Sequence, residues 1–164
     1  MFDMLKSNIS ANDFLCPLLY EKEREFTGRV LLNWLQQWVR DLHHPGLYVR
    51  GDGGPGISPV TWRGFQLFPD LAIVEGNTKY LAVEIKLITE VDPGGSMTKA
   101  VGQSVLYGQL GYMNSIGMIF DVRSHTKHTQ SVRVIQELEI SPVTSIFFLG
   151  SDESTRELEF IPGL

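Results

Sequence analysis

Cysteine is nearly absent from this chain, since Cys16 is the single one among 164 residues. One cysteine can form neither an internal disulfide nor a zinc site built from several thiolates. Long apolar runs are also missing, because no stretch approaches the roughly 18 residues that a membrane-spanning helix needs. The first residues, MFDMLKSNISANDF, carry acids and amides instead of the apolar core of a secretory signal. We therefore expect a cytoplasmic protein with no membrane segment.

Basic residues are scarce as well: 14 Lys and Arg stand against 19 Asp and Glu, for a formal charge of −5. This balance argues against a generic basic coat for nucleic acid, but it leaves a local basic patch or metal-assisted binding open. The hydrophobic share of 43% is that of an ordinary globular chain. The length fits one domain over residues 1–164, with its core at about residues 20–149.

The periodicity of apolar residues predicts an α/β domain. The strongest helix runs from about Tyr20 to Leu42, with Phe26, Val30, Trp34 and Trp38 on one face. The Gly-rich loop Gly51–Pro59 follows it. Further helices are expected from Ser96 or Thr98 to about Met113 and over His125–Leu138. Strands are predicted at Gly64–Phe68, Leu71–Val74, Lys79–Leu87, Ser115–Val122, Val143–Leu149 and Glu157–Ile161. The order α-β-β-β-α-β-α-β-β implies a mixed central β-sheet flanked by helices.

Three charged residues interrupt the second and third of these strands. Glu84 and Lys86 lie two apart and therefore share one face of a strand. If the turn between the strands centres near Asn77, Asp70 lies opposite Glu84, with Cβ atoms ~4.5–5.5 Å apart. Two carboxylates so close repel each other unless a proton or cation lies between them.

A hard divalent ion suits this group of side chains. Mg²⁺ or Mn²⁺ takes carboxylate oxygens, and the carbonyl of Ile85 could add a further ligand. Lys86 could orient or help deprotonate a water, or stabilise negative charge on a phosphate. The plainer interpretation is a solvated, ion-paired sheet face. A slip of one residue in the register would also turn Asp70 away.

Pro69-Asp70 followed by Glu84-Ile85-Lys86 resembles the signature of the PD-(D/E)XK nuclease superfamily. The family pattern has the Asp at the start of one strand and the E-x-K on the next, and the resemblance extends over Tyr20–Val122. It implies a restriction-endonuclease-like three-layer core of α-β-β-β-α-β order. It also implies Mg²⁺- or Mn²⁺-dependent hydrolysis of phosphodiester bonds in DNA, with Asp70 and Glu84 on the metal.

The helix after this strand carries a second resemblance. Gln103 and Tyr107, four apart, share a helix face and are similar to the Q-x-x-x-Y motif of the RecB-type and lambda-exonuclease-like branches. The resemblance implies that Gln103 lies at the active site with Tyr107 supporting it. Lys99, one turn earlier, could meet a phosphate. Chance occurrence of such a pair on a helix is the alternative.

The resemblance also implies an acid near the start of the first helix, where Glu21, Glu23 and Glu25 compete. Glu23 continues the apolar face toward the sheet, so we choose it, although all three could simply stabilise a helix N-terminus. The Glu-Arg pair at this point is similar to that of archaeal Holliday-junction resolvases. In resolvase-like relatives an Arg and a Gly-rich loop lie near the substrate, which makes Arg50 and Arg63 candidate phosphate contacts.

The histidines give weaker evidence of function. His43 and His44 are expected at the C-terminal end of the first helix, and His125 and His128 lack a third metal ligand. The sequence thus predicts a DNA nuclease that works with a second copy or a partner protein, since so small a chain leaves little room for a recognition domain. Two alternatives remain: a catalytically silent binding or assembly module of the same fold, and an unrelated α/β protein with surface ion pairs. The substrate form and the choice between endo- and exonuclease stay open.

Overall fold

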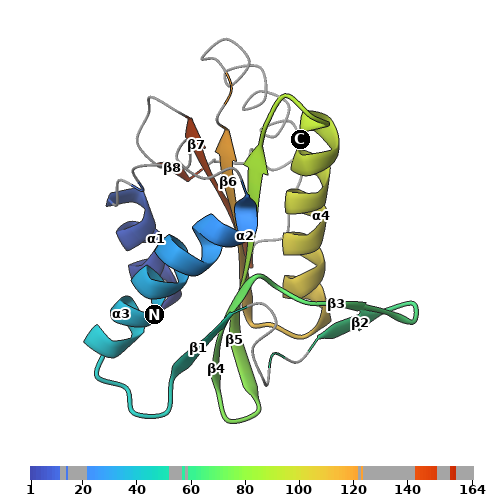
Figure 1. Cartoon of the computed structure of the whole chain (residues 1–164). Helices are drawn as coiled ribbons and strands as arrows, with labels where there is room; N and C mark the ends of the chain where they lie inside the picture. Colours follow the sequence, from blue (N-terminus) through green and yellow to red (C-terminus); the bar gives the residue numbers. More distant parts are fainter. Residues whose placement is uncertain are drawn as a thin grey trace, which may run out of the picture.

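The computed structural model describes residues 1–11, 14, 22–51, 57, 59–121, 123, 143–150 and 156–157. These residues form an α/β fold around a mixed six-stranded sheet of order β1-β4-β5-β6-β7-β8, with helices on both faces (Figure 1). Strands β5, β6 and β7 run parallel to one another, and the remaining neighbours pair antiparallel. The strands of this sheet are β1 (Tyr48–Gly51), β4 (Leu71–Glu75), β5 (Thr78–Ile88), β6 (Asn114–Asp121), β7 (Thr144–Gly150) and β8 (Arg156–Glu157).

The predicted first helix is present, but it contains a π-helical turn. It consists of α2 (Glu23–Phe26), the π-helix η2 (Thr27–Leu31) and α3 (Leu32–Asp41). The wider turn shifts the phase of the helix, so the buried face passes from Phe26 to Leu31 and Leu35 instead of through Val30. The short helix α1 (Phe2–Ala11) was not predicted, and it buries Leu5 and Ile9.

The second predicted helix, α4 (Pro93–Leu110), begins earlier than expected. The Asp-Pro-Gly-Gly segment, which resembles a chain break, is its first turn. Asp92 is the N-cap, and its side chain accepts a hydrogen bond from the amide of Gly95. Pro93 fits the first helical position, where no amide donor is needed. The predicted start at Ser96 or Thr98 is therefore wrong.

The predicted hairpin register is correct in the part of the hairpin next to Asp70 and Glu84. Leu71 pairs with Val83 and Ile73 with Leu81, as a turn centred near Asn77 requires, and a bulge follows at Ile73/Val74. The predicted strand at Gly64–Phe68 is present, but it does not belong to the main sheet. Its residues form β3 (Phe65–Leu67), which pairs with β2 (Val60–Trp62) as a separate two-stranded ribbon. The first strand of the main sheet is the short edge strand β1, which was not predicted.

The two faces of the sheet differ in what they bury. Odd-numbered residues of β5, from Leu81 to Leu87, join one large apolar cluster under α1, α2 and α3. On the α4 face, Ala82 and Ile88 belong to two separate smaller clusters. Glu84 and Lys86 lie between those two along the strand, so a polar strip divides the apolar packing under α4.

Several predicted features lie outside the described residues. They are Glu21, Cys16, the helix His125–Leu138 with His125 and His128, residues 52–56 of the Gly-rich loop and most of the strand Glu157–Ile161. Within the described part of the chain, no helix has the length and hydrophobicity to cross a membrane.

Candidate active site

The site forms where β5 continues past the beginning of β4. Strand β4 starts at Leu71, opposite Val83, so the last residues of β5 have no β4 partner for their amides. The side chains of two acids replace that strand. Asp70 Oδ2 accepts a hydrogen bond from the amide of Ile85 at 2.7 Å, and Glu23 Oε2 accepts one from the amide of Leu87 at 3.0 Å. The backbone of β5 thereby fixes both carboxylates.

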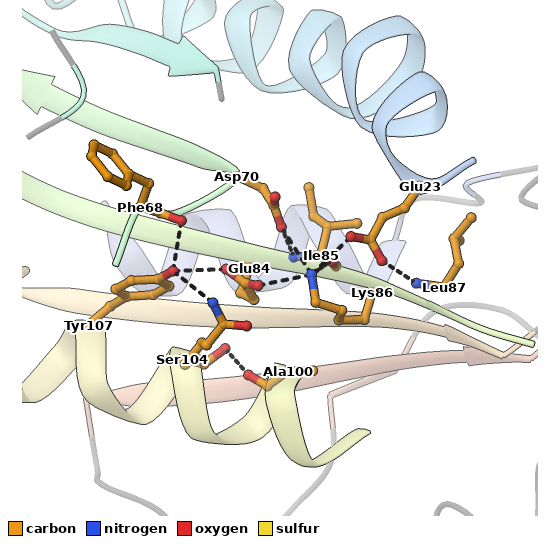
Figure 2. A network of polar contacts seen from close by, with 11 residues as sticks. Glu23, Phe68, Asp70, Glu84, Ile85, Lys86, Leu87, Ala100, Ser104 and Tyr107 are labelled. Atoms are coloured by element: carbon orange, nitrogen blue, oxygen red, sulfur yellow. Dashed lines mark hydrogen bonds and ion pairs between the residues drawn. The ribbon is translucent and has the colours of Figure 1, made fainter. Parts of the chain in front are cut away.

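The ammonium of Lys86 lies among the oxygens of this group (Figure 2). Its Nζ is 2.9 Å from Glu23 Oε1, 3.0 Å from Glu84 Oε1 and 3.9 Å from Asp70 Oδ2. It also donates to the carbonyl oxygen of Ile85 at 2.9 Å. Three carboxylates thus surround one ammonium, and when all are ionised the group has an excess of negative charge that attracts a further cation.

Burial sets the protonation of this group. The side chain of Glu84 is only 2% exposed. Its burial, followed by the nearby charge of Asp70, raises the pKa of Glu84 from 4.5 to about 7, although Lys86 and Tyr107 oppose the rise. Burial alone would lower the pKa of Lys86, but the carboxylates of Glu84, Asp70 and Glu23 outweigh it and raise the pKa. Lys86 is therefore a charged ammonium near neutral pH, suited to stabilising negative charge or orienting a water and unsuited to removing a proton.

Tyr107 joins the site to α4 and to the segment before Asp70. Its hydroxyl lies 2.9 Å from the carbonyl oxygen of Phe68 and 3.1 Å from Glu84 Oε2. A hydroxyl has one proton, so it donates to one of these oxygens at a time. Burial, and then the negative charge of Glu84, raises the pKa of Tyr107, which keeps the phenol protonated. Gln103 Nε2 donates to the same hydroxyl at 3.4 Å, so Gln103 meets the carboxylates through Tyr107.

The structure thus brings together most of the residues singled out in the sequence. Glu23 is the helix acid that reaches the site, whereas the side chain of Glu25 pairs with Arg29 at 3.1 Å, away from Lys86. The joined residues are Glu23, Asp70, Glu84, Ile85, Lys86, Gln103 and Tyr107.

The predicted phosphate contacts Arg50 and Arg63 have described partners next to them in the chain. The guanidinium of Arg50 lies over the ring of Tyr48 and donates to its hydroxyl at 3.0 Å, and that of Arg63 lies over Trp62. Lys99 is exposed on α4. Sequence reasoning also missed the carbonyl of Phe68, for which only its place directly before Pro69-Asp70 was a signal.

The donor set fits a hard divalent ion in its chemistry. Asp70, Glu84 and the carbonyl of Ile85 offer the oxygen ligands that Mg²⁺ and Mn²⁺ prefer. However, no group of three or more His, Cys, Asp and Glu side chains in the described ranges is arranged as a metal site. The oxygens in question contact the ammonium of Lys86 instead, so ion and ammonium would compete for them.

Comparison with known proteins returns no relative: no protein-family model, no curated protein and no solved structure matches this chain. The functional assignment therefore depends on the residues and their geometry.

Proposed function

We propose that this protein is a metal-dependent nuclease that hydrolyses phosphodiester bonds in DNA, with a restriction-endonuclease-like core. The observation that carries the proposal is the convergence of Asp70 and Glu84 on the ammonium of Lys86. Such a combination offers oxygen ligands for a cation and a positive group for a phosphate within one small volume.

The roles of the residues follow from their contacts. Asp70 and Glu84, with the carbonyl of Ile85, would hold Mg²⁺ or Mn²⁺, which supplies Lewis-acid chemistry and an activated water. Lys86 stabilises the negative charge that develops on the phosphate and orients the attacking water. Glu23 fixes Lys86, and Tyr107 fixes Glu84. No covalent intermediate with the protein is needed.

A catalytically silent nucleic-acid-binding module of the same fold is the second candidate. The observation that favours it is the ammonium of Lys86, which already neutralises part of the charge of the carboxylates without any metal. Such a module would bind DNA and leave its phosphodiester bonds intact with or without divalent ions.

A cleavage assay separates these functions. Single-stranded, duplex and branched DNA are incubated with the protein in Mg²⁺, in Mn²⁺ and in a chelator. We expect cleavage in either metal, none in the chelator, and a loss of ~100-fold or more for Lys86→Met, as for other charge-stabilising groups. Glu23→Gln should lower the rate, whereas the neighbouring control Glu25→Gln should leave it unchanged. Binding without cleavage would favour the silent module, and neither binding nor cleavage would contradict both.

A further inference from the structure

The ribbon formed by β2 and β3 carries exposed aromatic side chains at its tip. Trp62 is 42% exposed and Phe65 is 67% exposed. The two residues are direct cross-strand partners, so their side chains lie on the same face of the ribbon. Val60 and Leu67 share that face by alternation, and they pack into the apolar cluster under α4. The inner half of the face therefore belongs to the core, and the outer half is left in solvent.

The base of the ribbon is tightly held. Lys79 donates to the carbonyl of Pro59, just before β2, at 3.1 Å, and Tyr107 bonds to the carbonyl of Phe68, just after β3, at 2.9 Å. Figure 1 shows the tip extending away from the body, beyond α4. The base of the ribbon thus holds the aromatic pair in place. Less conformational entropy is then lost when a ligand binds.

The turn at the tip holds a positive charge in a strained conformation. Arg63 and Gly64 have φ values of 48° and 85°. Positive φ at both central residues is typical of hairpin turns, where Asn-Gly is the favoured pair and Arg is unusual. The guanidinium of Arg63 lies 5.5 Å from the centre of the Trp62 ring. The tip therefore combines two aromatic faces with a cation at a position where Asn would suit the backbone better.

We infer that this tip binds unpaired bases of a DNA strand, an inference that rests on the proposed nuclease function. Aromatic rings stack on any base without sequence preference, and Arg adds attraction to the phosphates. In paired DNA the base faces are already stacked and cannot meet Trp62 and Phe65. A strand held at the tip is within a few nucleotides of the carboxylates, since the five peptide steps from Phe65 to Asp70 span at most ~18 Å. The substrate class is therefore single-stranded DNA or DNA with a single-stranded region.

The test measures binding in a chelator, so that no cleavage interferes. Fluorescence anisotropy follows a labelled oligothymidylate, single-stranded or annealed to oligoadenylate. We expect the protein to prefer the single strand, and Trp62→Ala and Phe65→Ala each to weaken that binding about tenfold. Trp62→Phe should retain most of the affinity because it keeps a ring. Met4→Ala, which alters an exposed apolar residue on α1, is the matched control and should change nothing.

Arg63→Asn sharpens the test, because Asn suits the turn while the substitution removes the charge and its contact with the Trp62 ring. We expect this variant to keep its folding stability and to lose affinity for the single strand, with a weaker dependence on salt. Quenching of tryptophan fluorescence gives a second readout. It should disappear in Trp62→Ala, whereas Trp34 and Trp38 remain to report that the variant is folded.

Three outcomes would overturn the inference: unchanged single-strand binding by Trp62→Ala, an equal loss for single strand and duplex, or self-association of the chain that Trp62→Ala abolishes. Unchanged binding together with metal-dependent cleavage by the unmodified protein would leave the nuclease proposal standing. Single-strand binding that depends on Trp62, without cleavage in any metal, would support the inference about the ribbon tip and contradict the proposed nuclease function.

Discussion

The two faces of the sheet differ in how much apolar surface and how much charge they bury. The face under α1, α2 and α3 is one continuous apolar cluster in which Phe26, Phe120 and Phe147 are almost completely buried. The apolar residues under α4 are divided into two smaller clusters. Helix α4 lies so close to β6 that a Cβ at Gly117 would meet Ser104 Oγ at 2.8 Å. Its packing is interrupted where Glu84 meets Tyr107. The face under α1, α2 and α3 therefore contributes most of the hydrophobic stabilisation. The face under α4 buries less apolar surface because it also holds the charged groups.

The largest effect on stability should come from the continuous face. Phe26→Ala removes a fully buried ring that packs edge-to-face on Phe120, at 4.8 Å between ring centroids. We expect the free energy of unfolding to fall by about 3–5 kcal/mol in a denaturant titration. Val101→Ala, on the α4 face, removes less volume and should cost about 1–2 kcal/mol. Equal losses for the two variants would contradict the division between the faces.

Lys86→Met should cause the next largest loss of stability. The substitution leaves Glu23, Asp70 and Glu84 without the ammonium that they surround, and uncompensated buried charge costs about 3 kcal/mol or more. Measured in a chelator, the free energy of unfolding should fall by that amount. Mg²⁺ should restore part of the loss, because it competes for the same oxygens. A variant as stable as the unmodified protein in the chelator would show that the carboxylates do not depend on Lys86.

The pH dependence of stability should reveal the buried acid. The pKa of Glu84 is raised from 4.5 to about 7 in the folded protein, so the folded state holds this proton more tightly than the unfolded state does. The resulting stabilisation is present at low pH and is lost as the pH rises from about 4.5 to about 7. Compared with Glu84→Gln, the unmodified protein should lose up to about 3 kcal/mol across this range. A difference that stays constant with pH would contradict the shift.

Tyr107→Phe should have a smaller effect. It removes the hydroxyl that lies between the carbonyl of Phe68 and Glu84, and an unsatisfied buried acceptor costs about 1–3 kcal/mol. Tyr80→Phe is the matched control, because its hydroxyl bonds to the partly exposed Glu75, and the loss should stay below about 1 kcal/mol. Thermal unfolding of the two variants measures both values. A larger loss of stability for Tyr80→Phe than for Tyr107→Phe would show that the hydroxyl of Tyr107 contributes little to the stability of the fold.

Sequence reasoning succeeded where the relevant signals are local. The turn at Gly76 fixes the register of the hairpin, and the period of a strand puts Glu84 and Lys86 on one face. Spacing on a helix was enough to pair Gln103 with Tyr107. These rules join residues that are near in sequence or linked by one turn, which is why the centre of the site was predictable.

The missed features depend on contacts between distant segments. The π-helical turn at Thr27–Leu31 has no sequence signature, and it altered the buried face of the first helix. Strand β1 has only four residues at the edge of the sheet, and it is defined by its pairing with β4. The extent of burial of Glu84 also depends on α4, because Tyr107 covers it from another element. The sequence therefore showed which charges meet but not how deeply they are buried.

A titration with Mn²⁺, followed by electron paramagnetic resonance, tests the central claim that Asp70 and Glu84 form a divalent-cation site. The unmodified protein should bind a single ion at this centre. That binding should disappear in Asp70→Asn and Glu84→Gln and persist in Glu75→Gln, a control acid at the end of β4. It should strengthen in Lys86→Met, where the ammonium no longer competes. Mn²⁺ binding that is absent from the unmodified protein, or unchanged in Glu84→Gln, would contradict the account.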